Sequence, residues 1–175
     1  THYAAFDNAG GATGSVWKYS PDGIWTNITP PAPQGGSQSY WEVAADPTDA
    51  LRIVAMINGG KCFVSNDGGV SWTFHSFRLT SPRIRWQDAA AQDNYYLSTG
   101  EIAFDPFVPG KLWFAEGFGV WWTDDLAAPA IAWHSASEGI EEACGNAVLD
   151  PNGGTPDTAM WDLGAFRFDD VDTYT

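Results

Sequence analysis

The sequence predicts an all-β protein, a β-propeller built from four-stranded antiparallel blades. Three observations favour this fold: a turn motif that recurs along the chain, a second motif that keeps the same spacing, and the composition. Ten Trp, ten Phe, six Tyr, nineteen Gly and eleven Pro in 175 residues favour short strands and tight turns over helices. The one candidate helical stretch, at 88–94, is short.

The clearest copy of the turn motif is SNDGGVSW at 65–72. It has the Asp-box pattern, in which an aspartate, a glycine and a tryptophan follow a hydroxyl residue at fixed spacing. The Asp67 carboxylate can accept hydrogen bonds from backbone N–H groups of its own turn, and glycine supplies the positive φ that the turn requires. Trp72 begins the outgoing strand and can pack over the turn. The motif predicts a β-hairpin turn, repeated once per blade.

Weaker copies of the motif set the period of the fold. The aspartates of the four copies are Asp22, Asp67, Asp125 and Asp170. Their intervals are 45, 58 and 45 residues, and the middle interval contains an insertion. An Asp-Pro pair closes an apolar strand at three positions in the same register: Asp46, Asp105 and Asp150. A period of about 45 residues fits a four-stranded blade, and we expect these aspartates to form turns.

The period divides the chain into four blade pieces and one insertion. The pieces are approximately 1–36, 37–76, 99–136 and 140–175, and the insertion loop is 77–98. We expect the strands of the second piece at 40–45, 52–57, 61–65 and 71–75. Those of the third piece are expected at 101–104, 111–116, 120–123 and 131–135.

The number of blades predicts an incomplete ring. The chain opens at an apparent second strand of a blade, at 3–6, and stops where a fourth strand is due, which leaves about three and a half blades. Propellers close their rings because closure protects the sheet edges. The chain is therefore expected to be a segment of a longer polypeptide. The alternative is a ring completed by another polypeptide.

Charge and residue types exclude several classes of partner. The net charge is −14 with only eight basic residues, which argues against nucleic acid and anionic membrane surfaces. No apolar run reaches the length that spans a membrane. The three histidines are scattered without ligand spacing, so no metal site or other cofactor is expected. Cys62 and Cys144 fall two blades apart and are predicted to be buried free thiols.

Several segments together resemble one enzyme family. They are 16–19, the strand ending at 46–47, 65–72, 100–107, 138–142 and 161–170. In these segments the chain resembles the two-propeller xyloglucan endo-β-1,4-glucanases, glycoside hydrolase family 74. The resemblance implies a secreted enzyme in which two seven-bladed propellers face each other across a cleft that binds a decorated glucan. It also implies that this chain is a middle segment of such an enzyme, with a polysaccharide substrate and the remainder of the polypeptide or a second propeller as partners.

The resemblance also implies a catalytic residue. The family inverts the anomeric carbon with one aspartate from each propeller, each in an Asp-x-Gly-Gly turn. One of these maps onto Asp162 as the general acid, and this chain offers no candidate for the other. An inverting glycosidase holds its two carboxyl groups roughly 6.5–9.5 Å apart so that a water fits between them. We expect Trp161 and Phe166 to desolvate Asp162 and raise its pKa, and Gly164 to allow a sharp turn beside it.

Two departures from the family pattern leave an alternative open. Ala165 stands in place of the second glycine of the turn, and Phe168 in place of a histidine. Alanine tolerates positive φ poorly, so the turn is expected to shift. The alternative is a non-catalytic Asp-box propeller that binds a carbohydrate or a protein. The acidic residues at 138, 141 and 142 are interpreted as a solvated loop rather than a second acid.

Aromatic residues are the candidates for substrate binding, because sugars stack their C–H faces on such rings. The predicted binding residues are Trp86, Tyr95, Tyr96, Trp121 and Trp122. Strand alternation places Trp121 and Trp122 on opposite faces, so only one of them can face a given surface. The other three lie in the insertion, which is predicted to have no strand role, and loop packing is their alternative. Arg83 and Arg85 share that loop and either donate hydrogen bonds to sugar hydroxyls or remain solvated.

Overall fold

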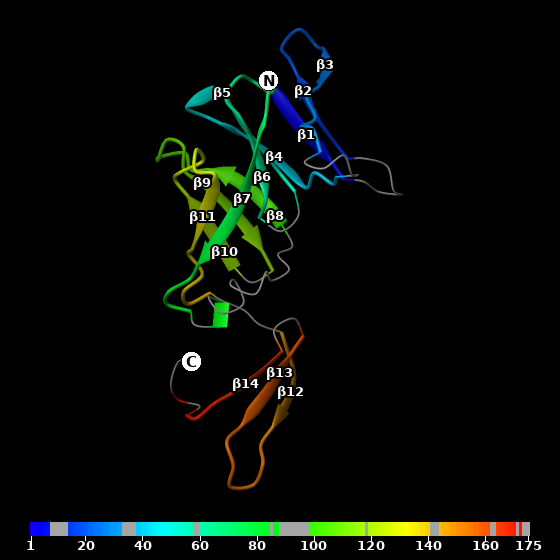
Figure 1. Ribbon diagram of the computed structural model, residues 1–175. Helices are drawn as coiled ribbons and strands as arrows, with labels where there is room; N and C mark the ends of the chain where they lie inside the picture. The colour runs from blue at the N-terminus through cyan, green and yellow to red at the C-terminus, as the bar shows by residue number, and fades with distance from the viewer. Residues whose placement is uncertain are drawn as a thin grey trace.

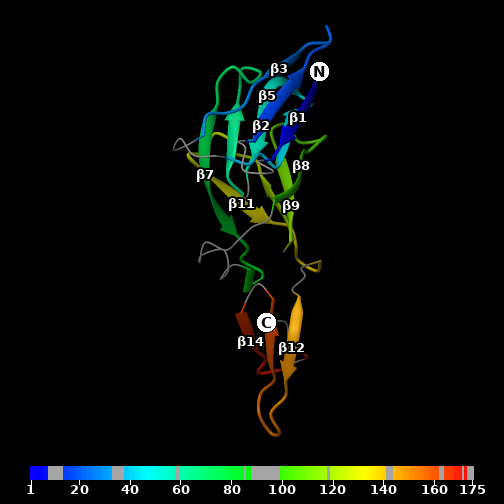
Figure 2. The same cartoon turned by 90° about the vertical axis from the view of Figure 1, so that its right-hand side faces the viewer.

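The computed structural model describes residues 1–7, 14–32, 38–57, 60–84, 86–87, 99–117, 119–140, 144–161, 164–170 and 172. Fourteen described strands form three sheets with the strand order of propeller blades (Figures 1 and 2). Helical backbone in the described part is limited to Trp86 and Gln87, and the candidate helix at 88–94 lies outside it. None of the described helical backbone is long and apolar enough to cross a membrane.

The strands are antiparallel within each blade-like unit. The first sheet has the order β1 (His2–Phe6), β2 (Ser15–Tyr19), β3 (Trp25–Asn27). An eight-stranded sheet joins two units of four. The first unit is β4 (Glu42–Asp46), β5 (Asp49–Met56), β6 (Cys62–Ser65) and β7 (Thr73–Thr80). The second is β8 (Thr99–Phe104), β9 (Leu112–Glu116), β10 (Gly119–Thr123) and β11 (Ala130–Ser135). The last sheet is β12 (Gly145–Leu149), β13 (Asp157–Met160) and β14 (Gly164–Arg167).

The eight strands predicted for the two central units are all present, with one correction at β7. The insertion was expected to begin at Phe77 without a strand role, but β7 continues to Thr80. Its second half pairs in parallel with β11, from Ser76 opposite Ala130 to Thr80 opposite His134. Phe77 and Leu79 pack against the core between the two units. Burial of these alternate apolar side chains explains why the strand extends.

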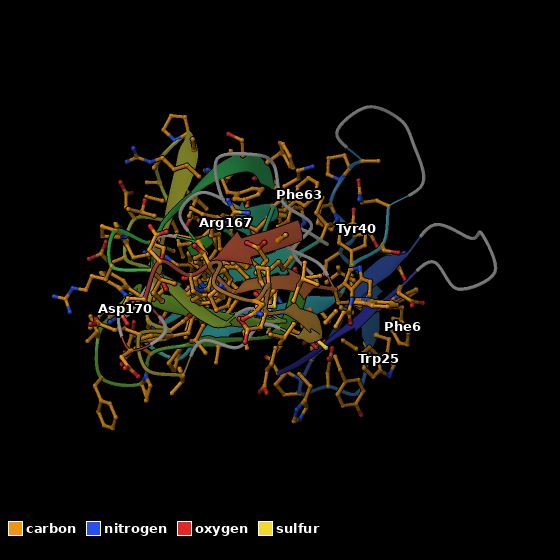
Figure 3. The ribbon with its side chains drawn as sticks, turned by 90° about the horizontal axis from the view of Figure 1, so that it is seen from below. Phe6, Trp25, Tyr40, Phe63, Arg167 and Asp170 are labelled. Carbon is orange, nitrogen blue, oxygen red and sulfur yellow. The ribbon has the colours of Figure 1, made fainter. Side chains whose placement is uncertain are left out.

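The central unit, β4–β7, is buried on both faces. Ile53 and Ala55 of β5 face the first sheet, in a cluster that includes Val16, Tyr40 and Phe63. The rings of Tyr40 and Phe63, labelled in Figure 3, lie 6.0 Å apart between their centroids. The alternate residues Val54 and Met56 face the other way, toward the second unit. The continuous apolar run at 53–57 follows from this two-sided burial, because both faces of the strand must be apolar.

A second core cluster joins the two units of the eight-stranded sheet. Phe114, Trp121 and Trp133 of the second unit are almost completely buried against β5 and β6. The ring of Phe114 stacks with that of Trp121 and lies edge-on to that of Trp133. The Trp133 indole N–H also donates to the carbonyl of Gly60, 3.0 Å away, in the turn before β6. Packing and this hydrogen bond together fix the two units relative to each other.

The last sheet lies at the opposite end of the molecule from the first, beyond the ends of β7 and β11 (Figures 1 and 2). All five residues of β12 are exposed, and Val148 and Leu149 expose most of their side chains. Among the described residues, a ring contact joins the loop after β7 to this sheet: the centroids of Trp86 and Phe166 are 6.4 Å apart.

The turn at 65–72 has the hydrogen bonds that the sequence predicts. The Asp67 carboxylate accepts bonds from the Ser65 hydroxyl at 2.8 Å and from the N–H and hydroxyl of Ser71 at 2.8 and 2.5 Å. The bonds from Ser71, together with that from Ser65, lower the pKa of Asp67 to about 2. Gly68 and Gly69 both have positive φ, 73° and 92°. These contacts support the structural role expected of Asp67.

Trp72 acts over a longer range than expected. Its ring packs against the cluster between the first sheet and the central unit. Its indole N–H donates to the carbonyl of Ile28 at 2.8 Å. Gly69 lies against the same residue, because a Cβ added there would be 2.8 Å from Ile28 Cδ1. The turn therefore holds the first sheet to the second as well as closing its own hairpin.

Other aspartates of the repeating motifs also form turns. Asp46 accepts hydrogen bonds from the N–H and hydroxyl of Thr48 and from Arg52. Burial alone would raise the pKa of Asp46, but these bonds together outweigh it, so the pKa is lowered. Asp105 accepts bonds from two backbone N–H groups and from the Trp113 indole. The carboxylate of Asp125 accepts from two backbone N–H groups and that of Asp170 from one. The predicted turn role is confirmed for these four.

The prediction for the cysteines is half correct. Both are free thiols, as expected, and Cys62 is fully buried in the core between the two units. Burial raises the pKa of the Cys62 thiol to about 12. Cys144, predicted to be buried, is exposed. It directly precedes β12, which carries no buried residue.

Replacing Gly69 by alanine should destabilise the protein more than the same change at Gly68. Both substitutions place a side chain at positive φ, which costs roughly 1–2 kcal/mol. Only the methyl group of Gly69→Ala would also overlap Ile28, whereas that of Gly68→Ala meets nothing closer than 3.4 Å. Urea unfolding of the two variants measures the difference. Equal losses would contradict the close contact between the turn and the first sheet.

The turn should also make stability depend on pH. Because the pKa of Asp67 falls from 3.8 to about 2 on folding, its contribution to the free energy of unfolding is fully present above about pH 4. It is lost as the pH falls through about 2. The free energy of unfolding of the wild type, minus that of Asp67→Asn, should therefore shrink between pH 4 and pH 2 in denaturant titrations. A constant difference across this range would contradict the proposed bonds.

Candidate functional site

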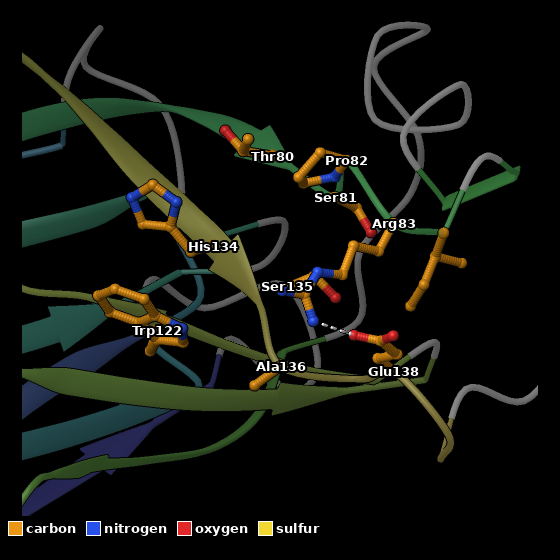
Figure 4. Close-up of a pocket in the computed structure, with 10 residues that line it drawn as sticks. Thr80, Ser81, Pro82, Arg83, Trp122, His134, Ser135, Ala136 and Glu138 are labelled. Atoms are coloured by element: carbon orange, nitrogen blue, oxygen red, sulfur yellow. Dashed lines mark hydrogen bonds and ion pairs between the residues drawn. The ribbon is translucent and has the colours of Figure 1, made fainter.

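A pocket of about 470 Å³ lies where β7 and β11 end (Figure 4). Its walls come from the loop after β7, from β10 and β11, and from the residues that follow β11. The parallel pairing of β7 with β11 brings these segments together, although the paired residues of the two strands are 54 positions apart in the sequence. The volume is within the range of small-molecule sites, roughly 300–1,000 Å³.

One end of the pocket is aromatic. Trp122 and His134 lie opposite each other on β10 and β11, with ring centroids 4.7 Å apart. Trp113 continues the row on β9, 6.3 Å from Trp122. The Lys111 ammonium lies 4.3 Å from the centroid of the Trp122 ring, in a cation–π contact. Cross-strand pairing on one face of the sheet therefore produces a ladder of rings, of which Trp122 and His134 face the pocket.

The other end of the pocket is polar. Arg83 Nη1 donates to Glu138 Oε2 at 2.7 Å, as the dashed line in Figure 4 shows. The side chains are 77% and 57% exposed, so the pair contributes little to stability. The hydrogen bond and charge of Glu138 raise the pKa of Arg83. The pair thus presents both N–H donors and carboxylate acceptors at the mouth of the pocket.

A buried polar network holds these walls together. The Gln87 Oε1 atom accepts hydrogen bonds from the hydroxyls of Ser81 at 2.7 Å and Ser135 at 2.6 Å. Gln87 Nε2 lies 3.5 Å from the hydroxyl of Ser137, which also accepts from the Val120 N–H. Gln87, Ser81 and Ser137 are at most 2% exposed. The network connects the loop after β7 with the end of β11 and the start of β10.

The close approach in this network requires glycine at position 119. A Cβ added to Gly119 would overlap the Ser137 hydroxyl oxygen, and the glycine has φ +150°. No sequence motif indicated Gln87, the serines or His134 as parts of a site. Their arrangement depends on the pairing of β7 with β11, which the sequence did not predict.

The structure separates the two adjacent tryptophans of β10. Trp122 lines the pocket, whereas Trp121 is 1% exposed and donates from its indole to Glu116 Oε1 at 2.8 Å. The prediction of Trp121 as a substrate-binding residue is therefore corrected, because its ring lies in the core. Trp86 is half-buried against Phe166. Tyr95 and Tyr96 lie outside the described residues.

Asp162 also lies outside the described residues, but the hairpin that flanks it is described. β13 and β14 pair in antiparallel register up to Met160 opposite Gly164. Gly164 has φ +81°, as expected for a sharp turn at this position. The Trp161 side chain is 72% exposed, and the backbone N–H of this residue donates to the Cys144 carbonyl at 2.9 Å. Phe166 is half-buried, in contact with Trp86.

Within the part of the chain that the structure describes, no three His, Cys, Asp or Glu side chains are grouped closely enough to hold a metal ion. The hydrogen-bonding groups around the pocket are hydroxyls, one ion pair and an imidazole. Such groups can form hydrogen bonds with the hydroxyls of a polar ligand.

No model of a known protein family matches the chain. A xyloglucanase of Paenibacillus sp is 26% identical over 208 residues, which cover 93% of this chain and 19% of the relative. An oligoxyloglucan-reducing end-specific xyloglucanase of Emericella nidulans is 24% identical over 218 residues, or 91% of this chain and 27% of the relative. The chain thus spans about a fifth to a quarter of the length of the curated relatives it matches.

Solved structures of GH74 enzymes are also similar to the chain. The crystal structure of a GH74 enzyme of Niastella koreensis superposes with a TM-score of 0.77 and 27% identity, covering 99% of this chain and 27% of that one. The resemblance to glycoside hydrolase family 74 is confirmed. The GH74 xyloglucanase of Xanthomonas campestris has the same TM-score at 24% identity and supports the propeller fold of this family 74-like chain.

The two tryptophans of β10 should respond differently to truncation. Trp121→Ala removes a fully buried ring and should lower the free energy of unfolding by about 3–5 kcal/mol. Trp122→Ala should cost clearly less, because its ring is only half-buried. Denaturant unfolding of both variants checks this. Equal destabilisation would place both rings in the core and remove Trp122 from the candidate site.

Proposed function

We propose that the chain is part of a glycoside hydrolase that cleaves the β-1,4-glucan backbone of xyloglucan with inversion. In this proposal Asp162 is the general acid, and an aspartate outside this chain is the base. The observation that carries the proposal is the hairpin at 157–167, which brackets the segment that matches the catalytic turn of the family. The similarity to a GH74 enzyme over 99% of the chain supports it.

The hairpin can supply what a general acid needs. The acid must be protonated at the leaving oxygen, which requires a raised pKa and an environment poor in water. Phe166, on the strand that follows the turn, is in ring contact with Trp86. Trp161 was expected to exclude water as well, but its side chain is 72% exposed, so that expectation is corrected. The second carboxylate would lie roughly 6.5–9.5 Å away, across the attacking water.

The departure at Ala165 is compatible with this role. The left-handed backbone conformation occurs at Gly164, and Ala165 continues the regular ladder opposite Ala159. An alanine at this position therefore needs no positive φ. Phe168, in place of the family histidine, donates its N–H to the Pro156 carbonyl at 2.9 Å, so the backbone of the hairpin continues past it.

The substrate class also suggests where the protein acts. Xyloglucan is a polymer, so a hydrolase of its backbone would be secreted and would work outside the cell. Its partners would be the polysaccharide and the second propeller that supplies the other aspartate. The loss of the family histidine at Phe168 favours, as a second candidate, a non-catalytic propeller that retains carbohydrate binding.

Substitution of Asp162 in the full-length protein tests the mechanism. Asp162→Asn should lower kcat on xyloglucan by about 10²–10⁴-fold, with binding retained, since it removes only the transferable proton. NMR of the first products should show inversion at the anomeric carbon. Asp150→Asn, at an exposed aspartate of an Asp-Pro pair, is the matched control and should leave kcat unchanged.

Intact hydrolysis by Asp162→Asn would refute the role of this residue. The 175-residue chain by itself should show no turnover, because it holds only one of the two carboxyl groups. Turnover by the isolated chain would refute the division of the pair. Retained xyloglucan binding in a full-length wild type that has no hydrolytic activity would favour the non-catalytic alternative.

A further inference from the structure

We propose that the ion pair between Arg167 and Asp157 is a positioning pair, which sets the register of the β13–β14 hairpin and thereby the place of the aspartate between the two strands. The chemical role of that aspartate, Asp162, rests on the proposed function. The effect of the pair on the register rests on the hairpin itself, so the two can be tested separately.

The pair joins directly opposite residues at the end of the hairpin away from the turn. Asp157 is the first residue of β13, and Arg167, labelled in Figure 3, is the last of β14. Arg167 Nε donates to Asp157 Oδ1 at 2.8 Å, and Arg167 Nη2 donates to Asp157 Oδ2 at 3.2 Å. Two parallel bonds between a guanidinium and a carboxylate require one relative orientation of the two groups. The pair is therefore more specific in geometry than a single contact between opposite charges.

Packing gives this hairpin little preference for one register. The described residues of β12, β13 and β14 include no buried side chain. On the face that carries the ion pair, the next ladder pair toward the turn is Ala159 opposite Ala165, and both side chains are small. Register is strongly specified where one face of a strand is buried, and weakly where neither face is. The hairpin differs in this from β5, whose second half is buried on both faces.

Two other contacts of the hairpin do not select the register in the same way. The ring contact of Phe166 with Trp86, at 6.4 Å between centroids, is not directional. The bond from the Phe168 N–H to the Pro156 carbonyl extends the ladder, but nearly every residue has the same backbone groups, so such bonds can form again after a slip. A slip by one residue would place the two charged side chains on opposite faces of the hairpin. Only the observed register keeps both bonds of the ion pair.

The exposure of the pair explains why its effect is local. The Arg167 and Asp157 side chains are 69% and 29% exposed, so the pair contributes little to the stability of the whole protein. The hydrogen bond from Arg167, together with its charge, lowers the pKa of Asp157, so the carboxylate stays ionised at neutral pH. A small contribution is enough to decide between registers that differ little in packing.

The position of the turn depends on this register. Three ladder pairs lie between the ion pair and the turn, and a slip would change the number of residues that connect the strands. A shift by one residue moves a strand by about 3.3 Å. A misplacement of a reacting group by about 1 Å can already lower a rate by about a hundredfold. A population of slipped hairpins should therefore lower kcat.

Kinetics of the full-length protein on xyloglucan test the positioning role. Arg167→Gln and Asp157→Asn should each lower kcat about three- to tenfold, the range for one charged pair, with KM within about twofold of wild type. The double variant should be no worse than either single variant, because both changes remove the same pair. Arg167→Lys should remain impaired, since an ammonium cannot form the two parallel bonds. Arg78→Gln, at an exposed arginine of β7, is the matched control and should leave kcat unchanged.

A disulfide between Ala159→Cys and Ala165→Cys reports the register without any activity. Directly opposite residues on antiparallel strands have Cβ atoms about 4.5–5.5 Å apart, near the reach of a disulfide. Cys144→Ser removes the exposed thiol that precedes β12. In the full-length protein, oxidation should close the disulfide at least about threefold more slowly when Arg167→Gln is added, whereas Arg78→Gln should not change the rate. Mass mapping of unreduced peptides measures the closed fraction.

The outcomes separate the pair from the proposed function. Unchanged kcat and unchanged disulfide closure in the pair variants would overturn the positioning role and leave the proposed function standing. A full-length wild type without hydrolytic activity would overturn the proposed function, and slowed closure with Arg167→Gln would still support the pair. A fall in kcat that comes with a raised KM and a lower unfolding temperature would indicate a general loss of structure and overturn the positioning role. Full activity of Arg167→Lys would overturn it as well.

Discussion

Burial of the central unit on both faces is the constraint on which the rest of the structure depends. The strands β5 and β6 direct alternate side chains into two different cores, one shared with the first sheet and one with β8–β11. Both neighbours bury apolar side chains against this unit. The Asp67 turn and Trp72 then fix the first sheet at one end, and the Trp133 bond fixes the second unit at the other.

The architecture could be predicted from the sequence because it repeats. Turn chemistry and the Asp-Pro pairs recur with a period of about 45 residues, interrupted by one insertion, and each turn depends on hydrogen bonds within a few residues, as at Asp46 and Asp105. Local chemistry of this kind is visible in a single sequence. The extension of β7 is different, because its partner strand begins 50 residues after its own end. No local pattern encodes that pairing, so residues 77–80 were interpreted as loop.

The candidate site was less predictable, because it also depends on contacts between segments that are far apart in the sequence. Alternation along β10 predicted that Trp121 and Trp122 face opposite ways, and this is observed, but it could not decide which face is buried. That choice depends on packing against β5 and β6. Gln87 and its serines are common polar residues, and only the fold makes them a network. The position of Asp162 was inferred from the resemblance to a family, and its side chain lies outside the described residues.

The parallel pairing of β7 with β11 has a consequence for how the molecule opens. Two units that share one hydrogen-bonded ladder cannot separate without breaking that ladder, so β4–β11 should exchange its amide hydrogens as one cooperative block. Among the described strands, β12–β14 share no ladder with this block. Amide exchange in this sheet is therefore expected to be independent of exchange in the β4–β11 block. The hairpin proposed to carry the chemistry thus lies outside the β4–β11 ladder, and the ring contact of Trp86 with Phe166 links the two.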